Sequence, residues 1–342
     1  MSFSAADQRF MRRALQLAAR GRGTVEPNPM VGCVIVRDEA IVAEGHHRRF
    51  GGPHAEVYAL RNSGDRARGA DVFITLEPCC HYGKTPPCTD ALIEAGVARV
   101  VAAMHDPYHE VAGKGLEALR RAGIRVECGL LADEAEAINA PYLKLRRQRR
   151  PWVILKWAQS IDGKIADAKG RSRWISGEPA RRLVHRWRGQ VDAVLVGIGT
   201  VLADDPLLTG RLVRPRRVAA RIVLDTRLRL PPGSRLARSA SEAPVIVVTS
   251  RAAVRAHPGR RRRLERLGVE VLPLRTTGRR IDLAALLDEL GRRQMSNVLV
   301  EGGGDVLGEF FGRGLADEAR IFVSPRLLGG RGAPSALSGP GQ

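Results

Sequence analysis

Short apolar runs rich in β-branched residues alternate with amphipathic segments along the first 145 residues of the chain. This alternation predicts strands and helices in turn, as in a parallel or mixed α/β sheet. Helices are expected after a Ser4 cap at the N-terminus and again from His54, near Cys88 and near Gly115. The expected strands of this half are Gly32–Arg37, Asp71–Leu76, Ala98–Ala103 and Ile124–Cys128.

The pattern breaks at residues 143–152, where the charged run LKLRRQRRPW contains a proline. We therefore expect a first domain at residues 1–145, a linker at 146–150 and a second domain at 151–342. The second domain shows the same alternation of strands and helices. Its expected strands are Val153–Trp157, Ala193–Gly197, Arg221–Asp225, Pro244–Thr249, Val269–Leu272, Asn297–Glu301 and Arg320–Val323, and its expected helices are Glu178–Arg188, Leu283–Arg293 and Asp305–Gly312.

Composition narrows the class of protein. The chain has 342 residues, of which 44% are hydrophobic and 27% charged, and no apolar run reaches the roughly 18 residues of a membrane span. The N-terminus lacks the apolar core of a signal peptide, so a cytoplasmic protein without a membrane segment is expected. Three of the five cysteines fall within ten residues, which favours metal ligation over a disulfide framework.

The formal charge of +20 raises the question of nucleic-acid binding. The densest basic clusters are RRQRR at 146–150 and GRRRRLERL at 259–267, but arginines are spread along the whole chain. Aromatic residues make up only 4%, so stacking platforms for single strands are scarce. No nucleic-acid partner is expected.

The segments PHAE at 53–56 and PCCHYGKTPPC at 78–88 contain the residue types of a zinc site. His54, Cys79 and Cys88 are the three expected ligands. A catalytic zinc keeps its fourth position for water, whereas a structural knot would take Cys80 or His81 as a fourth ligand. A further alternative is that His54 only caps a helix and that the three cysteines are buried apolar residues. Cys33 and Cys128, which lie in apolar strand runs, are expected to be core residues.

Glu56 favours the catalytic interpretation. A carboxylate two residues after the histidine, together with a Pro-Cys segment, is the arrangement of zinc deaminases. Zinc lowers the pKa of bound water to about 7, and Glu56 would then carry protons to a ring nitrogen and to the departing ammonia. The eight residues between the two cysteines depart from the usual Cys-x-x-Cys spacing and would bring His81, Lys84 and Thr85 to the pocket rim. Such a loop suits a phosphorylated small molecule.

Motifs in both halves resemble one family. In the first half these are NPMVGCVIV at 28–36, GHHRRFGGPHAE at 45–56 and TLEPCCHYGKTPPC at 75–88. In the second they are LKWAQSIDGKIA at 155–166, WISG at 174–177, VGIGTVLADDPLLT at 196–209 and VEGGGDVLGEF at 300–310. Together they resemble the bifunctional riboflavin-biosynthesis deaminase/reductases over nearly the whole chain.

The resemblance implies an α/β protein with a three-layer domain like that of cytidine deaminase and a second domain like dihydrofolate reductase. It implies deamination of 2,5-diamino-6-(5-phosphoribosylamino)pyrimidin-4(3H)-one, followed by NADPH-dependent reduction of the ribosyl group of 5-amino-6-(5-phosphoribosylamino)uracil to ribityl. It also implies a homo-oligomer formed through the C-terminal domain. The expected cofactors are Zn²⁺ and NADPH.

The resemblance also assigns residues by motif position. Glu56 would be the proton carrier of the deaminase, and its substrate would contact Asn28, His47, His81 and Lys84. The dinucleotide would contact Ala158, Trp174, Thr200, Asp204, Gly303 and Gly304. The reductase substrate would contact Ser172, Arg188, Leu208, Arg211 and Glu301.

The residues of the second half support these roles only weakly by themselves. Glycines 302–304 after a strand can form a phosphate cradle or merely a tight turn, and they lack the Gly-x-Gly-x-x-Gly fingerprint. Asp204 and Asp205 before a proline can also form a plain turn. Asp204, Glu301 and Lys156 are alternative proton sources for the reduction. The tail at 329–342 is rich in glycine, so a flexible or partner-dependent end is expected.

Two other functions are compatible with parts of the sequence. A nucleic-acid or nucleoside deaminase with an appended domain would explain the zinc motif and the basic charge, but not the motifs of the second half. A basic, zinc-stabilised binding protein would have a closed four-ligand site and would tolerate Glu56→Gln.

Overall fold

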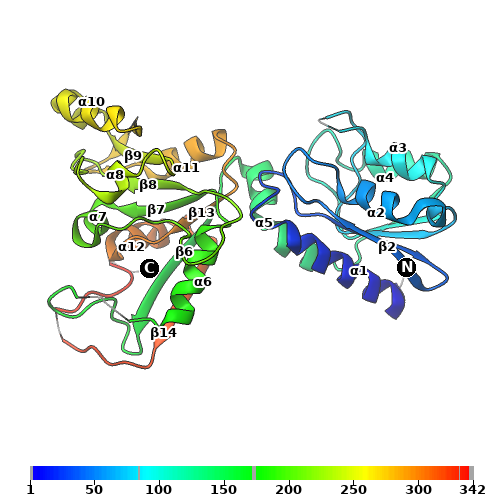
Figure 1. The fold of residues 1–342 in the computed structure, drawn as a ribbon, viewed down its shortest axis with the longest axis horizontal. Helices are drawn as coiled ribbons and strands as arrows, with labels where there is room; N and C mark the ends of the chain where they lie inside the picture. Colours follow the sequence, from blue (N-terminus) through cyan, green and yellow to red (C-terminus); the bar gives the residue numbers. More distant parts are fainter. Residues whose placement is uncertain (1–2, 84, 172–174, 331, 339–342) are drawn as a thin grey trace. The chain divides into compact units, whose positions relative to one another are not determined.

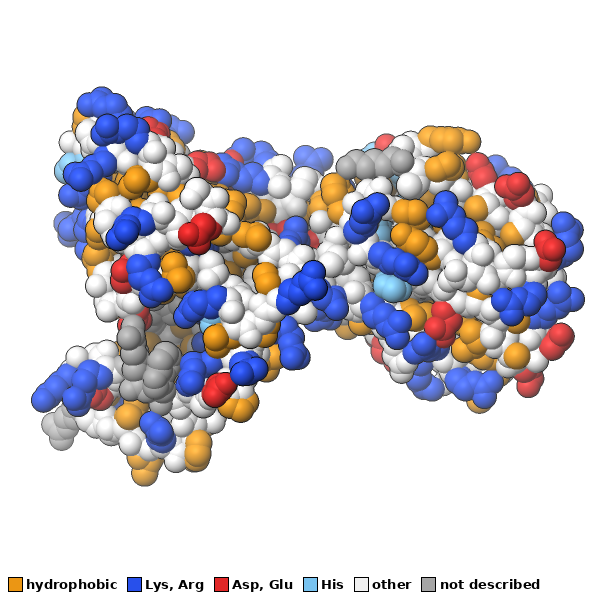
Figure 2. Space-filling view, viewed as in Figure 1, with side chains coloured by type: hydrophobic (Ala, Val, Ile, Leu, Met, Phe, Trp, Pro, Cys, Tyr) orange, Lys and Arg blue, Asp and Glu red, His pale blue; other side chains and the backbone are white. Residues whose placement is uncertain are grey.

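The computed structural model describes residues 3–83, 85–171, 175–330 and 332–338, and the chain divides into two compact units, residues 1–148 and 149–342 (Figure 1). Each unit has its own sheet and apolar core. Within the described part of the chain, no helix is long and apolar enough to cross a membrane. Figure 2 shows Lys and Arg side chains spread over this face of both units and mixed with acidic and apolar groups.

A five-stranded sheet, in the order β2-β1-β3-β4-β5, forms the centre of the first unit. β1 is antiparallel to β2 and β3, whereas β3, β4 and β5 are parallel to one another. The strands are β1 Gly32–Arg37, β2 Ala40–His46, β3 Asp71–Ile74, β4 Arg99–Ala102 and β5 Arg125–Cys128. The helices are α1 Ala5–Ala18, α2 Ala55–Ser63, α3 Cys88–Glu94, α4 Lys114–Arg121 and α5 Ala132–Gln148.

Two glycines allow helices to pack closely on the sheet. A Cβ on Gly32 would lie 2.0 Å from the carbonyl oxygen of Ala14 in α1, and one on Gly45 would lie 2.2 Å from that of Ala55 in α2. Gly45 is the strand partner of Cys33, so Gly32 and Gly45 face opposite sides of the sheet. Consequently α1 and α2 cover opposite faces, and the unit has three layers (Figure 1).

The sequence analysis missed β2, which follows β1 through a two-residue turn. Asp38 and Glu39 form this turn with positive φ values of 51° and 59°. Such hairpin turns usually carry Asn-Gly or Asp-Gly, so this sequence lacks the customary signal. β2 is also an edge strand with an exposed first half, which obscures the apolar alternation.

The second unit contains a seven-stranded sheet in the order β10-β9-β8-β7-β13-β6-β14, in which all paired strands are parallel. Its strands are β6 Trp152–Ser160, β7 Ala193–Gly197, β8 Ala220–Leu224, β9 Val245–Ser250, β10 Val269–Leu274, β13 Asn297–Val300 and β14 Glu318–Ser324, with a small ribbon of β11 Thr276–Thr277 and β12 Arg280–Ile281. The helices are α6 Glu178–Arg188, α7 Ile198–Asp204, α8 Arg235–Arg238, α9 Arg251–Ala256, α10 Pro258–Arg266, α11 Leu283–Arg292 and α12 Gly304–Gly312.

The central strands of this sheet are buried on both faces, as their continuous apolar runs predict, whereas one face of the edge strand β14 is exposed. β7 and β13 are neighbours, and the backbone N–H of Glu301 donates to the carbonyl of Leu195 at 2.8 Å. The segments that follow the two strands, at 198–200 and 301–304, therefore start side by side. Ligands of parallel α/β sheets bind at this carboxyl edge.

The helix α5 differs from the expected boundary. It continues through Arg146 and Arg147 to Gln148, so these residues are helical where a linker is expected. The charge run and Pro141 inside the helix concealed it. One face of α5 contributes buried residues to the core of the first unit, and this burial stabilises the helix despite its sequence.

Residues 332–338 of the tail, which was expected to be flexible or partner-dependent, contact the rest of the second unit. Ser335 forms a β-bridge with Lys164, and the backbone N–H of Ser338 donates to the carbonyl of Gly304 at 3.1 Å. The segment thus packs against the start of α12.

Asp7 and Arg99 fasten α1 to the sheet. Ser4 caps α1 as predicted, and Asp7 completes a reciprocal capping box with it. The Arg99 guanidinium then donates to Asp7 at 2.7 Å, to Asp71 at 3.2 Å and to Glu127 at 3.0 Å. These hydrogen bonds to Arg99 lower the pKa of Asp7 and of Glu127.

We expect Arg99→Met to destabilise the protein by about 2–3 kcal/mol at pH 7, because it leaves three carboxylates around a largely buried position without their cation. A carboxylate with a lowered pKa contributes stability above its ordinary pKa of about 4 and loses it as the pH falls. The difference between wild type and variant should therefore shrink between pH 7 and pH 3. Urea unfolding followed by circular dichroism measures both effects.

The matched control is Arg125→Met, because Arg125 also approaches Glu127, at 3.5 Å, but is two-thirds exposed. Its cost should be below about 0.5 kcal/mol. Equal costs for the two variants would show that the Arg99 network is not what fastens α1.

Candidate functional site

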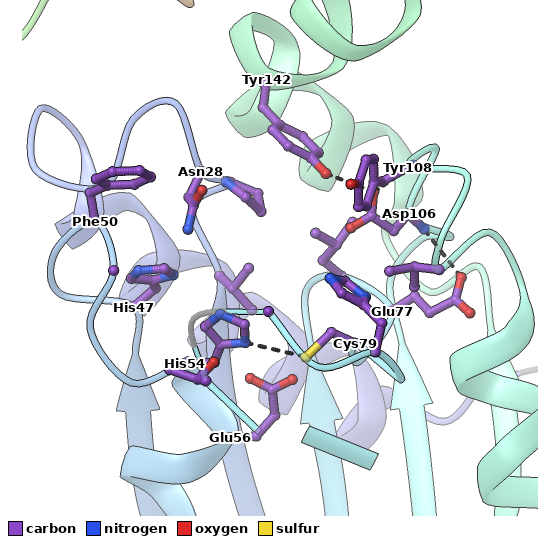
Figure 3. Close-up of a pocket in the computed structure, with 18 of the residues that line it drawn as sticks. Asn28, His47, Phe50, His54, Glu56, Glu77, Cys79, Asp106, Tyr108 and Tyr142 are labelled. Atoms are coloured by element: carbon purple, nitrogen blue, oxygen red, sulfur yellow. Dashed lines mark hydrogen bonds between the residues drawn. The ribbon is translucent and has the colours of Figure 1, made fainter. Parts of the chain in front are cut away.

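Three potential metal ligands converge where two helices begin. His54 is the N-cap of α2, Cys88 is the first residue of α3, and Cys79 lies in the loop after β3. His54 Nδ1 lies 3.2 Å from Cys88 Sγ. It lies 3.5 Å from Cys79 Sγ, the contact marked in Figure 3. The ligand atoms of all three lie within 4.8 Å of one another.

This trio fits zinc. Two sulfurs and one imidazole nitrogen are zinc's preferred donors, and three protein ligands leave a fourth position for water. The backbone N–H of Cys88 donates to Cys79 Sγ at 3.3 Å. Hydrogen bonds from Cys88 and His54 lower the pKa of Cys79 to about 4, although burial opposes this, so the site favours a thiolate. Thiolate is the form that binds metal.

Glu56 lies beside the three potential ligands but is not one of them. Its carboxyl group points toward the space between His54 and Cys79 (Figure 3). The side chain is 3% exposed, and Oε2 is buried without a hydrogen-bond partner. Burial raises the pKa of Glu56. A buried carboxyl oxygen without a partner is a group held for a ligand or a water, which suits a proton carrier.

The two alternative fourth ligands point elsewhere. Cys80 Sγ donates to the carbonyl of Glu110 at 3.7 Å, and His81 Nε2 lies 3.5 Å from the Glu110 carboxylate. Neither belongs to the cluster of ligand atoms found in the described residues. The geometry therefore favours an open site over a closed knot.

A cavity of about 260 Å³ opens above the trio. Asn28, His47 and Phe50 form one wall, and Asp106 and Tyr108 belong to the facing wall (Figure 3). Burial lowers the pKa of His47 to about 4, so the ring is neutral, and its Nε2 is 2.7 Å from the Arg49 carbonyl.

Of the four predicted substrate contacts of the deaminase, Asn28, His47 and His81 line this cavity. Lys84 lies outside the described residues.

Tyr108, Tyr142 and Arg146 are cavity-lining residues that the sequence analysis missed. The Tyr142 hydroxyl donates to Asp106 at 2.8 Å. The Arg146 guanidinium lies 5.0 Å from the Tyr108 ring centre and 5.3 Å from that of Tyr142. A single sequence gave no signal for them, because they come from an unrecognised helix and a loop.

Glu77 holds this wall in place and was also missed. Its buried carboxylate accepts hydrogen bonds from His105 and from the backbone N–H groups of Asp106, Gly113, Gly115 and Leu116. It therefore fixes both the loop that carries Tyr108 and the first turn of α4. In the sequence, the only sign of this role was that Glu77 directly precedes the Pro-Cys segment.

A cavity of about 580 Å³ lies in the second unit. The predicted residues Ala158, Arg188, Asp204, Leu208 and Arg211 all line it. Ser172 and Trp174 lie outside the described residues. Two predicted cofactor contacts, Ala158 and Asp204, therefore share this cavity with predicted substrate contacts.

Arg188 and Glu301 form a buried bidentate ion pair, with both distances 2.7 Å. Burial raises the pKa of Glu301, but the charges of Arg188 and Lys156 more than offset it and hold this pKa below its ordinary value. Burial lowers the pKa of Lys156. The pair occupies two nitrogens of Arg188, so these two nitrogens are not available to grip a phosphate in this arrangement.

A separate cavity of about 500 Å³ is lined by the other predicted cofactor contacts, Thr200, Gly303 and Gly304. Gly303 is the N-cap of the nine-residue α12. A Cβ on Gly302 would lie 2.6 Å from Cβ of Val306, so a glycine is required where the strand end meets this helix. The first-turn N–H groups of α12 suit a pyrophosphate.

The two folds and their sites define a zinc-binding deaminase domain joined to a reductase domain. Residues 4–104 match the cytidine and deoxycytidylate deaminase zinc-binding region, and residues 151–342 match the RibD C-terminal domain. The expected fold class, cytidine-deaminase-like followed by dihydrofolate-reductase-like, is confirmed.

The relatives identify the family. The chain is 44% identical to riboflavin biosynthesis protein RibD of Escherichia coli over 94% of this chain and 89% of that protein. It is 41% identical to RibD of Aquifex aeolicus, over 94% and 88%. The chain belongs to the RibD family of bifunctional deaminase/reductases of riboflavin biosynthesis.

Solved structures agree with this assignment. Acinetobacter baumannii RibD superposes with a TM-score of 0.87 at 40% identity, covering 98% of this chain and 91% of that one. The Thermotoga maritima diaminohydroxyphosphoribosylaminopyrimidine deaminase/5-amino-6-(5-phosphoribosylamino)uracil reductase gives 0.85 at 39%, covering 98% and 92%. The match of the second unit disfavours a nucleic-acid deaminase with an unrelated appended domain.

We expect Cys79→Ser and Cys88→Ser to lose most of the zinc that copurifies with the protein, because serine replaces a soft thiolate by a poor zinc ligand. Cys80→Ser is the matched control and should keep about one zinc per chain. Elemental analysis of purified protein gives the stoichiometry. Loss of zinc from the Cys80 variant would reveal a closed four-ligand knot.

Proposed function

We propose that this chain performs two steps of riboflavin biosynthesis. The first deaminates 2,5-diamino-6-(5-phosphoribosylamino)pyrimidin-4(3H)-one to 5-amino-6-(5-phosphoribosylamino)uracil. The second reduces the ribosyl group of that product to ribityl with NADPH. Similarity to the Thermotoga maritima enzyme over nearly the full chain supports both substrates. The single observation that carries the deaminase step is the unpartnered carboxyl oxygen of Glu56 beside a three-ligand metal site.

In the deaminase, His54, Cys79 and Cys88 would hold the zinc. When bound, it supplies a water whose pKa falls to about 7. Glu56 would serve as the proton carrier, taking up a proton, delivering one to the ring nitrogen and assisting the departure of ammonia. Its burial raises the pKa of the carboxyl group above the ordinary value of a glutamate, which suits a group that takes up and releases protons.

The cavity walls orient the pyrimidine. Asn28 offers both a donor and an acceptor, and neutral His47 keeps one ring nitrogen for a ligand because its Nε2 is on the Arg49 carbonyl. His81 and Lys84 are proposed to contact the phosphoribosyl part from the long loop between the cysteines.

In the reductase, Thr200, Gly303 and Gly304 are proposed to hold the dinucleotide, with Ala158, Asp204 and Trp174 nearer to the nicotinamide. NADPH supplies the hydride when bound. The substrate is proposed to lie against Ser172, Arg188, Leu208, Arg211 and Glu301.

Because Glu301 already occupies Arg188, Arg211 is the better candidate for the substrate phosphate. Lys156, Asp204 and Glu301 all remain proposed proton sources.

We also propose a homo-oligomer formed through the C-terminal unit. β14 is an edge strand, and its outward residues Ile321 and Val323 are 46% and 58% exposed. An exposed apolar edge strand is a ready surface for pairing with a second copy.

For the first step, we expect Glu56→Gln to lower ammonia release by a factor of about 10³ or more, since the amide cannot carry the proton. Zinc content and reduction of supplied 5-amino-6-(5-phosphoribosylamino)uracil should persist. Product masses with and without NADPH separate the two steps. Ammonia release by the variant at the wild-type rate would exclude Glu56 as the proton carrier.

For the oligomer, Val323→Lys should shift the mass measured by light scattering toward one chain, because a charge on the exposed apolar edge strand disfavours pairing with a second copy. Leu202→Lys, an equally exposed leucine on α7, is the control and should not change the mass. An unchanged mass in the Val323 variant would place the interface elsewhere.

A further inference from the structure

The proposed dinucleotide cavity contains a cation with no assigned role. Arg229 lines it together with Leu224 and Thr226, which end or follow β8. Gly303 and Gly304 line the same cavity after β13. β7 lies between β8 and β13, so the two strand ends are about 10 Å apart, given a strand spacing near 4.8 Å. A dinucleotide whose pyrophosphate rests on the start of α12 can therefore extend its adenosine half toward β8.

The turn that carries Arg229 is rigidly built. The Asp225 carboxylate accepts the backbone N–H of Leu230 at 2.7 Å, and the N–H of Leu228 donates to the Asp225 carbonyl at 3.0 Å. Arg260 donates to the Leu228 carbonyl at 3.0 Å. Leu228 and Leu230 are completely buried, whereas Arg229 between them is exposed. The two buried leucines thus anchor this turn, and the arginine between them points outward.

Arg229 is also the less neutralised of the two cations in this cavity. Arg280 is paired with the Glu309 carboxylate. Arg229 comes no closer than 3.8 Å to Asp225, whose other oxygen is already used by the turn. In the described part of the chain, no side-chain hydrogen bond holds the Arg229 guanidinium. Its planar donor fork therefore remains open to a ligand.

We propose that Arg229 binds the 2′-phosphate of the dinucleotide and selects NADPH over NADH, an inference that rests on the proposed reductase function. A guanidinium matches a phosphate with two parallel hydrogen bonds. An arginine near the ribose is a general means of accommodating a 2′-phosphate. The apolar side chains of Leu224, Ile281 and Leu283 line the same cavity and offer a surface for the adenine ring.

The test measures binding, without turnover, on the full chain. Isothermal titration compares NADPH with NADH, and 2′,5′-ADP with 5′-AMP, which differ by the phosphate in question. Loss of a charge-assisted bidentate contact should weaken NADPH and 2′,5′-ADP by about tenfold to a hundredfold in Arg229→Met. NADH and 5′-AMP should change by less than about twofold, because neither carries the 2′-phosphate.

Two variants serve as controls. Arg227→Met removes the same charge from the same turn, but Arg227 is exposed and does not line the cavity, so it should preserve the preference for NADPH. Arg229→Lys keeps the charge without the fork and should fall between wild type and Arg229→Met. This series separates a specific contact from a general loss of positive charge.

The outcomes are distinct. An unchanged NADPH preference in Arg229→Met, or its loss in Arg280→Met instead, would overturn the role of Arg229. Equal binding of NADPH and NADH by the wild type would also overturn it, while leaving a reductase that uses either nucleotide. Absence of dinucleotide binding in the wild type would overturn both this role and the proposed cofactor of the reductase.

Discussion

The convergence of His54, Cys79 and Cys88 depends on how the helices and loops of the first unit pack on its sheet. These residues come from two helix starts and a loop, and their ligand atoms can meet only if the helices hold fixed positions on the sheet. The close packing of α2 against Gly45 sets the position of His54. On the facing side of the cavity, the Glu77 carboxylate holds the loop that carries Asp106 and Tyr108, through hydrogen bonds from backbone N–H groups. The geometry of the metal site therefore follows from backbone packing several residues away from it.

In the second unit, charged side chains lie near the carboxyl edge of a largely buried sheet. Parallel strands bury both faces, so polar groups are confined to the strand ends. Arg188 and Glu301 neutralise each other there with good geometry, which is the condition under which a buried ion pair is tolerated. The charge of Lys156 helps to lower the pKa of Glu301, and burial lowers the pKa of Lys156 itself. A site so arranged is already organised before a ligand arrives.

The basic charge of the chain is divided between structural and ligand-facing roles. Arg99 contacts three carboxylates, Arg188 is paired with Glu301, and Arg221 is completely buried, with its guanidinium on carbonyl oxygens and Ser239. Among the described residues, the arginines that line the cavities described above include Arg146, Arg188, Arg211, Arg229 and Arg280. A formal charge of +20 therefore says little about partners until the individual side chains are located.

The sequence by itself predicted most strands and singled out His54, Cys79, Cys88 and Glu56, which the structure brings together, because apolar periodicity and local motif spacing are properties of short segments. It did not reveal β2, whose Asp38-Glu39 turn lacks a glycine, or α5, whose charge run resembled a linker. Tertiary structure decided the cavity roles of Tyr108, Tyr142 and Arg146, the hydrogen bonds of Glu77 and the mutual pairing of Arg188 with Glu301. These depend on contacts between residues far apart in the chain, and such contacts are fixed only when the sheets and helices pack.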